Sequence, residues 1–308
     1  MANEDQHQPT ASWLALGVVM MAQIQLSFNA FSVSIGGITH DLGIPATAVG
    51  TALTTGTFAM AAFILVGAKI GSKIGTRLAF RIGVLIPALA AVAIATAQNG
   101  TVLFVAQATS GASVALSAPA LTVLIASNYH GKQQAKAVGF LASAIPLAQV
   151  ISLLIAGWFA STIGWRWSFA LVALIGLTNF ALSFLLKPVA PQRDLPIDWI
   201  SAAIASVAII LISFGFSGMT SWGAFMATPN APFSFFGISP VPILLLGGLI
   251  LGQLFLTRTG RLNASGGTPL LSLSIVSSSQ EKAIFIVHPL LSGFTRISAA
   301  DWRLRDWA

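Results

Sequence analysis

Residues 12–37 read SWLALGVVMMAQIQLSFNAFSVSIGG, and no residue in this stretch carries a formal charge. A helix that crosses a bilayer needs about 20 consecutive, mostly apolar residues. The stretch is too continuously apolar for a strand of an outer-membrane barrel, which alternates in polarity over about ten residues. The preceding residues 1–11 contain Glu4 and Asp5 but no Lys or Arg, unlike a cleaved signal peptide. We therefore expect residues 12–37 to form a membrane-spanning helix that stays in the protein.

The composition of the whole chain extends this expectation. Of its 308 residues, 56% are hydrophobic and 7% are charged, and the mean hydropathy is +0.86. Soluble globular chains carry about 25% charged residues, so this chain lacks the polar residues to cover a water-facing surface. The fold class that we predict is an all-α membrane protein with eight transmembrane helices, at residues 12–37, 50–68, 80–98, 101–127, 137–163, 168–187, 198–218 and 239–257. Disordered chains and nucleic-acid-binding domains are excluded by composition, and disulfide scaffolds by the absence of Cys.

The basic residues are distributed unequally between the two sets of loops. Eleven lie in the loops on one side, against one, Arg166, on the other. Cytoplasmic loops of membrane proteins carry the excess of Lys and Arg. We therefore expect a plasma (inner) membrane protein with a cytoplasmic N-terminus. The eleven are Lys69, Lys73, Arg77, Arg81, Lys132, Lys136, Lys187, Arg193, Arg258, Arg261 and Lys282.

Ionisable side chains are absent from the interior of the predicted spans. Enzymes that work inside membranes need carboxylates, His or metal ligands at the reacting bond. The four His lie in loops or in the tail, without ligand spacing to one another. The sequence therefore predicts no enzyme, no catalytic residue, no metal site and no cofactor.

Neutral polar side chains do occur inside the spans. Gln25 and Asn29 are four residues apart in the first span, so we expect them to share one helical face. An amide that faces lipid without a partner is costly. These residues therefore either line a cavity that binds a solute or form hydrogen bonds between helices, and the sequence leaves both readings open. The cavity candidates are Gln25, Ser27, Asn29, Gln107 and Gln149, and Pro146 is expected to bend the fifth span.

Small residues mark two further helix surfaces. Residues 110–113 (SGAS) form a thin face of the fourth span, and Gly248 and Gly252 form a GxxxG pair in the eighth. Such residues let the backbones of membrane helices approach closely. We interpret both as packing surfaces.

The segment after the second span resembles the signature of a known transporter family. Residues 68–77 read AKIGSKIGTR, which is similar to the G-x-L-x-D-R-x-G-R-R motif at the same place in the major facilitator superfamily. Lys73, Gly75 and Arg77 match the motif, while Ser72 stands at its Asp position. The resemblance implies a cytoplasmic gating loop that contains these four residues. An ordinary positive-inside loop is the alternative.

Further segments extend the resemblance over roughly residues 12–285. The segments 198–202 (DWISA) and 269–271 (PLL) resemble the fourteen-span drug:proton antiporter branch, which implies multidrug efflux. Two positions depart from that branch, because its first-span Asp falls on Ser27 and its fourth-span Arg falls on Gln107. Proton coupling through those positions is therefore not expected. The other similar segments are 130–139, 157–158, 165–169 and 41–43.

The regions that we expect are a cytoplasmic N-terminal tail (1–11), a six-helix N-terminal transporter bundle (12–187), two extra transmembrane helices (188–257), and a cytoplasmic loop with a truncated or atypical tail (258–308). Fourteen spans need about 450 residues, at about 20 per span plus loops. Residues 283–287 begin like a ninth helix, but Pro289 follows. We expect truncation after the eighth span, with foreign sequence from near residue 288. A natural half-transporter with an interfacial tail is the alternative.

The function that we predict is export of small lipophilic or drug-like solutes by alternating access. In such transporters one six-helix half moves against another around a midplane site. One such half is expected here, so the partners would be the lipid bilayer, a small-molecule substrate, and either a second copy of the chain or a second transporter half, but no nucleic acid. The alternative is a non-transporting membrane fragment or a partner subunit of a full-length transporter.

Overall fold

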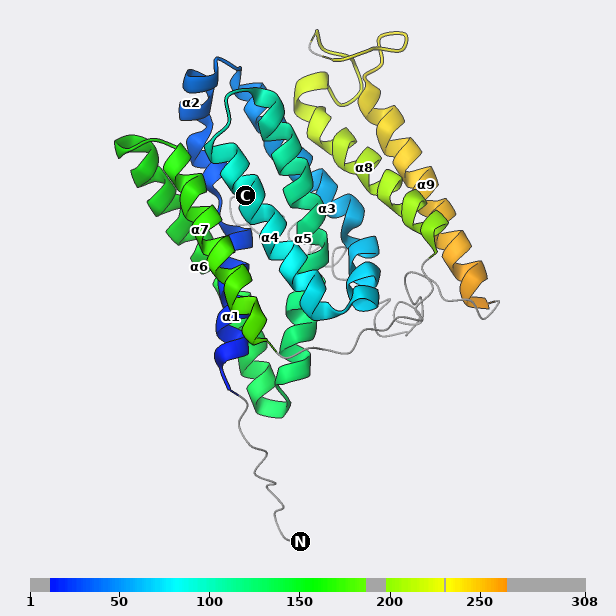
Figure 1. Cartoon of the computed structure of the whole chain (residues 1–308). Coiled ribbons are helices and arrows are strands. Elements are labelled where there is room, and N and C mark those ends of the chain that lie inside the picture. The colour runs from blue at the N-terminus through cyan, green and yellow to red at the C-terminus, as the bar shows by residue number, and fades with distance from the viewer. Residues whose placement is uncertain (1–11, 187–197, 230, 265–308) are drawn as a thin grey trace, which may run out of the picture.

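A computed structural model of the chain describes residues 12–186, 198–229 and 231–264, and their regular structure is helical apart from two isolated bridges (Figure 1). The predictions for residues 1–11, for Lys187 and Arg193, and for residues 265–308 lie outside these ranges. The helices are α1 (Leu14–Ser27), α2 (Ala30–Leu42), α3 (Ala46–Ile74), α4 (Thr76–Ala95), α5 (Gly100–Asn128), α6 (Gly131–Thr162), α7 (Arg166–Leu182) with the 3-10 turn η1 (Ser183–Leu185), α8 (Trp199–Trp222) and α9 (Pro240–Ala264).

These helices form eight segments that are long and apolar enough to cross a membrane, with α1 and α2 making one interrupted span. This agrees with the predicted fold class and span count, and the chain is a membrane protein. Most helices extend past their predicted ends, and three of them do so by about two turns: α3 continues to Ile74, α6 begins at Gly131, and α9 continues to Ala264. Basic residues lie in these extra turns, because their aliphatic stems let the charge reach the headgroups from a helical backbone.

Successive spans run in opposite directions, which gathers the basic residues at one end of the bundle (Figure 1). We call the end where α1 begins the basic end. Among the described residues, every Lys and Arg except Arg166 lies there, and Arg166 begins α7 at the opposite end. The basic-end residues are Lys69, Lys73, Arg77, Arg81, Lys132, Lys136, Arg258 and Arg261.

The helices α3, α4 and α5 pack closely through glycines. A Cβ at Gly111 on α5 would overlap the carbonyl of Gly56 on α3, and a Cβ at Gly83 on α4 would overlap Ser117 on α5. The thin face predicted around residues 110–113 therefore is a helix contact. In the predicted GxxxG pair of α9, only one glycine lies at a helix contact. Gly248 packs against α8, whereas a Cβ at Gly252 would have no heavy atom within 4 Å.

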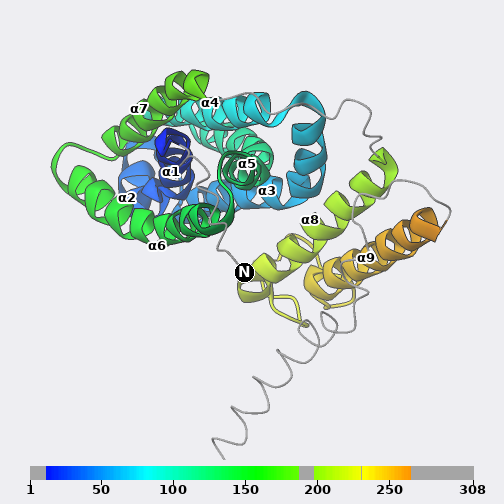
Figure 2. The ribbon, with the colours of Figure 1, turned by 90° about the horizontal axis from the view of Figure 1, so that it is seen from below.

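Figure 2 shows α1 near the middle of the bundle, with α6 on one side of it and α4 and α7 on the other. The Tyr129 hydroxyl at the end of α5 accepts from the N–H of Leu16 and donates to the carbonyl of Ser12, both at 2.9 Å. Burial raises the pKa of Tyr129, so this hydroxyl remains a donor. On α7, the fully buried amide of Asn179 donates to Val18 and accepts from Ala22, both at 3.1 Å, in the orientation that satisfies both groups.

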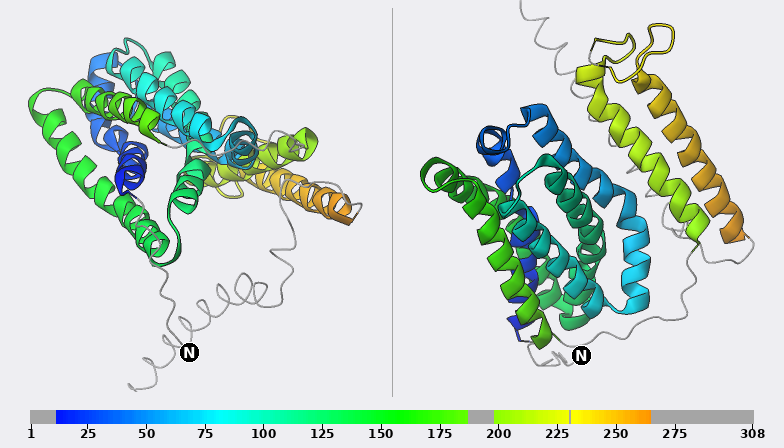
Figure 3. Two further views of the ribbon diagram at one scale, coloured as in Figure 1. Left: turned by 60° about the horizontal axis from the view of Figure 1, so that its bottom comes forward. Right: turned by 45° about the horizontal axis from the view of Figure 1, so that its top comes forward.

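The helices α8 and α9 form a pair that lies beside α3, outside the other six spans (Figures 1 and 3). The Ser206 hydroxyl on α8 donates to the carbonyl of Ala62 on α3 at 2.6 Å. The ring of Phe58 on α3 meets that of Phe214 on α8 edge to face, with centroids 5.9 Å apart. The pair is therefore attached to the bundle through α3.

Candidate functional site

The first membrane span is interrupted at its midpoint. Helix α1 ends at Ser27 and α2 begins at Ala30, so Phe28 and Asn29 in the centre of the Leu14–Leu42 span are not helical. The prediction of one continuous helix over residues 12–37 is wrong here. The Asn29 side chain caps α2 by accepting from the hydroxyl and N–H of Ser32, at 2.8 and 3.5 Å, as expected for a residue type favoured at N-caps. Its backbone N–H donates to the buried Ser152 hydroxyl of α6 at 3.1 Å.

The interruption also separates the two amides that we predicted to share one face. Gln25, in the last turn of α1, points into the contact with α4, where its Nε2 donates to the carbonyl of Val84 at 2.9 Å. Gly176 on α7 provides the space for this amide, because an added Cβ would overlap it. Asn29 instead caps the next helix. Residues four apart are neighbours only on an uninterrupted helix, so the prediction of a shared face fails.

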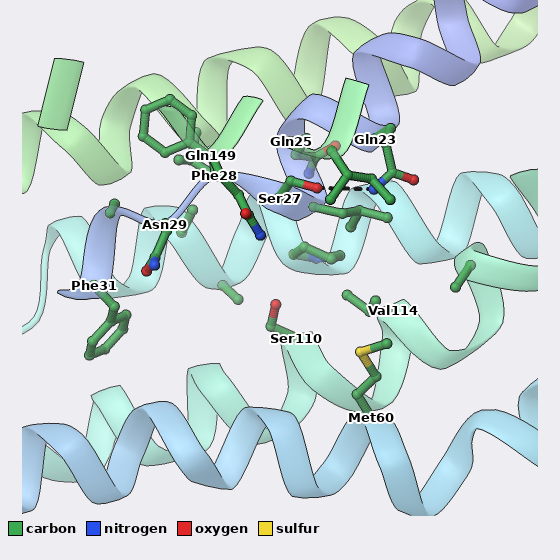
Figure 4. A pocket seen from close by; sticks show the side chains of 18 of the residues that line it. Gln23, Gln25, Ser27, Phe28, Asn29, Phe31, Met60, Ser110, Val114 and Gln149 are labelled. Carbon is green, nitrogen blue, oxygen red and sulfur yellow. Dashed lines mark hydrogen bonds between the residues drawn. The ribbon is translucent and has the colours of Figure 1, made fainter. Parts of the chain in front are cut away.

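The interruption opens onto a cavity of about 650 Å³ inside the bundle (Figure 4). Side chains from α1 to α7 line it. This volume lies in the range of about 300–1,000 Å³ that is usual for small-molecule sites. All five predicted cavity candidates are among the lining residues: Gln25, Ser27, Asn29, Gln107 and Gln149.

The cavity wall is mostly apolar, with a few amides and hydroxyls. Figure 4 shows Gln149 of α6, Asn29 and Ser110 of α5 around the same space, which Phe31 and Met60 also line. None of its lining residues in the described part of the chain is ionisable. Within the same ranges, no group of three His, Asp or Glu side chains is placed to hold a metal ion. The arrangement can therefore bind an uncharged solute by hydrogen bonds and apolar contact.

Some polar side chains of the cavity already form hydrogen bonds within the protein, and others do not. The Gln23 amide donates to the Ser27 hydroxyl at 3.0 Å. The Oε1 of Gln25 is buried and has no partner among the described residues. The amides of Gln107 and Gln149 make no side-chain hydrogen bond to any residue that the structure describes. Gln107 and Gln149 therefore offer donors and acceptors that helix packing does not use, and Gln25 offers the acceptor Oε1.

Pro146 lies inside α6, as predicted, next to the cavity wall. A proline in a helix removes one hydrogen bond to the carbonyl four residues earlier. That carbonyl belongs to Ala142, which lines the cavity together with Gln149. The helix therefore lacks one backbone hydrogen bond where it borders the cavity.

Of the four residues predicted to form a gating loop, only Gly75 lies between helices. Ser72 and Lys73 belong to the last turn of α3, and the Ser72 hydroxyl donates to Ala68 of its own helix at 3.0 Å. Gly75 alone connects α3 to α4, with a φ of 97° that favours glycine. Arg77 lies in the first turn of α4. A single residue with positive φ makes a longer loop unnecessary.

Two arginines at the start of α4, Arg77 and Arg81, bind the 3-10 turn η1 at the end of α7. The Arg77 guanidinium donates to the carbonyl of Phe184, and the Nε of Arg81 donates to the Ser183 hydroxyl at 3.3 Å. The Arg81 guanidinium also lies 3.8 Å from the centre of the Phe184 ring. Cations are stabilised at helix C-termini, where carbonyls lack partners. No sequence pattern indicates this contact, because the partners are 107 and 102 residues apart in the chain.

At the opposite end, Asp41 pairs with Arg166. The Arg166 guanidinium donates to the Asp41 carboxylate, and the Trp165 indole N–H donates to it at 3.0 Å. Arg166 also donates to the carbonyl of Ala97, between α4 and α5, at 3.3 Å. Asp41 therefore joins the end of α2 to the start of α7. The segments 41–43 and 165–169 stand out in the sequence, but nothing in it indicates that they pair.

A second ion pair joins α8 to α9 at the basic end. Asp198 caps α8 by accepting from the N–H groups of Ile200 and Ser201 at 3.2 Å, and the Nε of Arg258 on α9 donates to it at 3.4 Å. Burial opposes ionisation, but the hydrogen bonds from Ser201 and the charge of Arg258 outweigh it and lower the pKa of Asp198 below its ordinary value. The carboxylate is therefore charged at neutral pH.

Known proteins match both the sequence and the fold. The family model of the Major Facilitator Superfamily matches residues 15–298. The chain is 25% identical over 282 residues to puromycin resistance protein pur8 of Streptomyces alboniger, covering 89% of this chain and 52% of that protein. It is 26% identical over 284 residues to the probable actinorhodin transporter of Streptomyces coelicolor, covering 88% and 46%. The chain thus spans about half the length of the curated relatives it matches.

Solved structures of transporters share the fold. The crystal structure of the peptide transporter POT in complex with sulfate superposes with a TM-score of 0.56, at 16% identity, over 80% of this chain and 52% of that one. That of the human organic anion transporter MFSD10 (TETRAN) superposes with a TM-score of 0.50, at 12% identity, over 74% and 59%. At such identities the likeness establishes the fold alone.

Proposed function

The chain belongs to the major facilitator superfamily, and we propose that it is the N-terminal portion of a transporter that exports small, uncharged, lipophilic solutes by alternating access. The observation that carries this proposal is the interruption at Phe28 and Asn29, which opens onto the cavity. Alternating-access transporters bind their solutes near the bilayer midplane, often at interrupted helices. Here 14 residues of α1 precede the interruption and 13 residues of α2 follow it. The proposed activity needs no covalent chemistry.

The solute class is inferred from the lining of the cavity. A formal charge at the centre of a bilayer costs at least about 2.5–3.5 kcal/mol, and the described lining holds no counter-charge. Amides such as Gln107 and Gln149 can donate and accept hydrogen bonds, which suits a neutral solute with polar groups. The names of two relatives refer to puromycin and actinorhodin, which supports small organic molecules as a class.

The same lining bears on energy coupling. Ser27 and Gln107 both line the cavity. In the fourteen-span drug:proton antiporter branch that the sequence resembles, these two positions hold Asp and Arg. Neither Ser27 nor Gln107 titrates near neutral pH. We therefore propose that any coupling to protons uses groups other than these two.

Two further proposals concern placement and assembly. We place the chain in the plasma membrane with the basic end in the cytoplasm. We also propose that a second bundle, either another copy of this chain or a separate transporter half, completes the cavity. The apolar surface of α6 supports this, because Leu147 and Leu154 are exposed on it. The chain contains no Cys, so crosslinking of Leu154→Cys tests whether a second copy completes the cavity. A crosslinked dimer would support this possibility. A monomer in cells that export solute would contradict it.

Orientation is tested by thiol labelling in intact cells. A membrane-impermeant maleimide should label Ala46→Cys, at the end opposite to the basic residues, and should leave Lys132→Cys unlabelled. The reverse pattern would contradict the proposed orientation.

The export activity is tested by accumulation of a neutral dye, Nile red, in cells that express the chain. Expression should lower accumulation, and Gln149→Leu should restore it because the substitution removes a cavity amide at nearly constant volume. The matched control is Gln253→Leu, which removes an exposed amide on α9 outside the cavity. Accumulation that expression leaves unchanged would favour a non-transporting fragment. Export of the cation tetraphenylphosphonium but not of Nile red would contradict the solute class and leave transport standing.

A further inference from the structure

The connection between α8 and α9 is a folded hairpin. It comprises residues 223–239, of which all except 230 are described. Backbone hydrogen bonds join Ala227 to Gly237 at 2.9 Å and Ser239 to Phe225 at 2.8 Å. Phe235 and Ile238 exchange two more, at 3.1 and 2.8 Å. These bonds give the backbone a defined shape, which sets the direction in which each Cα–Cβ bond leaves it.

The hairpin exposes large apolar side chains. Phe225 and Met226 are 76% exposed, and Phe236 is fully exposed, with a positive φ of 50°. Phe233, Phe235 and Ile238 are exposed too. A bulky residue with positive φ is rare because its Cβ crowds the backbone. The structure therefore presents these side chains to the outside instead of packing them onto α8 and α9.

The position of the hairpin matches the surface of a bilayer. Helix α8 has 24 residues, which at about 1.5 Å per residue is about 36 Å. The hydrocarbon core of a bilayer is about 30 Å thick, so the end of α8 at Trp222 reaches the headgroup layer. The hairpin begins there and projects beyond the ends of both helices (Figure 3).

The charge pattern points to lipid as the partner. No ionisable residue occurs between Asp198 and Arg258, so the hairpin has no charge that would hold it in water. Segments that lie in the headgroup–acyl boundary use Trp, Phe and Leu for insertion. Helices α8 and α9 contact the bundle through α3. At the basic end, the ion pair between Asp198 and Arg258 links the two helices to each other. The opposite end of the two helices has no comparable ion pair among the described residues.

We propose that residues 223–239 insert the side chains of Phe225, Met226 and Phe236 into the headgroup–acyl boundary of the leaflet opposite to the basic end. The hairpin thereby anchors the α8–α9 pair at a fixed depth in the membrane. The partner is the bilayer surface, and the inference does not depend on transport.

The absence of Cys allows a direct test with the full chain. Phe236→Cys and Phe225→Cys are each labelled with the environment-sensitive fluorophore NBD and placed in phosphatidylcholine nanodiscs. The matched control is Ala46→Cys, which is exposed at the start of α3 at the same end of the bundle. Lipids brominated near the headgroup should quench both hairpin labels and shift their emission to the blue, and should quench the control label much less.

Three results would overturn the proposal. The first is water-like emission from both hairpin labels without quenching by the brominated lipids. The second is equal quenching of the hairpin and control labels. The third is quenching by a nitroxide on a second copy of the chain that disappears on dilution with unlabelled chain, which would assign the hairpin to a contact between copies.

Discussion

The backbone N–H of Asn29 donates a hydrogen bond of 3.1 Å to the hydroxyl of Ser152, which is completely buried on α6. Inside a membrane, backbone groups freed by a helix interruption need partners from neighbouring segments. Ser152 supplies one such partner, and its own hydroxyl donates to the carbonyl of Gln149 at 2.9 Å. The contact therefore fixes the position of the interruption against α6, on the wall of the cavity.

Ser152→Ala is expected to destabilise the protein by about 0.5–1.5 kcal/mol, because it removes the part-buried hydrogen bond that the N–H of Asn29 donates to α6. The measurement is the thermal unfolding midpoint of the purified chain in detergent. Ser143→Ala on the same helix is the control, since that exposed hydroxyl bonds only within α6. Equal midpoints for the two variants would show that Ser152 does not stabilise the interruption.

Gly111→Ala should destabilise by about 1–3 kcal/mol, because the added methyl group overpacks the α3–α5 contact at the carbonyl of Gly56. Gly139→Ala on α6 has open space around its added methyl group and should be neutral or stabilising by up to about 1 kcal/mol. Thermal unfolding of both variants measures the difference. If Gly111→Ala unfolds at the same temperature as Gly139→Ala, the close approach of the two helices is not as described.

Asp41→Asn and Arg166→Gln should each lower stability modestly, because the pair is partly exposed and such pairs contribute about 0.2–1 kcal/mol. The two changes should not add, since either one removes the same interaction. A double-mutant cycle on the unfolding free energy measures the coupling. Strictly additive effects would mean that Asp41 and Arg166 act independently.

Asp198→Asn should reduce stability at pH 7, with a loss that shrinks at low pH. The pKa of Asp198 is lowered in the folded chain. Its contribution is therefore fully present above the ordinary pKa of 3.8 and is lost as pH falls through the lower folded-state value. Unfolding of wild type and variant at pH 7 and pH 3 tests this, and Arg258→Gln should give a similar loss at pH 7. A gap that widens on acidification would contradict the sign of the shift.

Arg77→Ala should lower the unfolding temperature while leaving the orientation in the membrane unchanged. The guanidinium loses its contact with the Phe184 carbonyl, but Lys69, Lys73 and Arg81 still mark the basic end. Lys73→Ala is the control, because this residue is exposed and should have little effect on unfolding. Inverted labelling of Arg77→Ala at single cysteines would instead assign the residue a topological role.

Much of the candidate site could be predicted from residue type alone. Gln107 and Gln149 are amides within uncharged spans, and the cost of placing them in lipid predicts that they face the interior; both line the cavity. The prediction fails for the geometry of Gln25 and Asn29, because it assumes a continuous helix. The Asn at the start of α2, three residues before Ser32, is a capping signal, so a helix start at this position is consistent with residue type.

The sequence by itself determined the eight spans and the separation of basic residues, because hydropathy and charge act on each segment separately as it meets the bilayer. Only the tertiary structure decided that Asn29 meets Ser152, which partners Arg77 and Asp41 bind, and that the amides of Gln25, Asn29, Gln107 and Gln149 line one cavity. Those features depend on groups brought together from positions more than 100 residues apart. Such contacts are set by how the helices pack, and no local pattern in the chain encodes them.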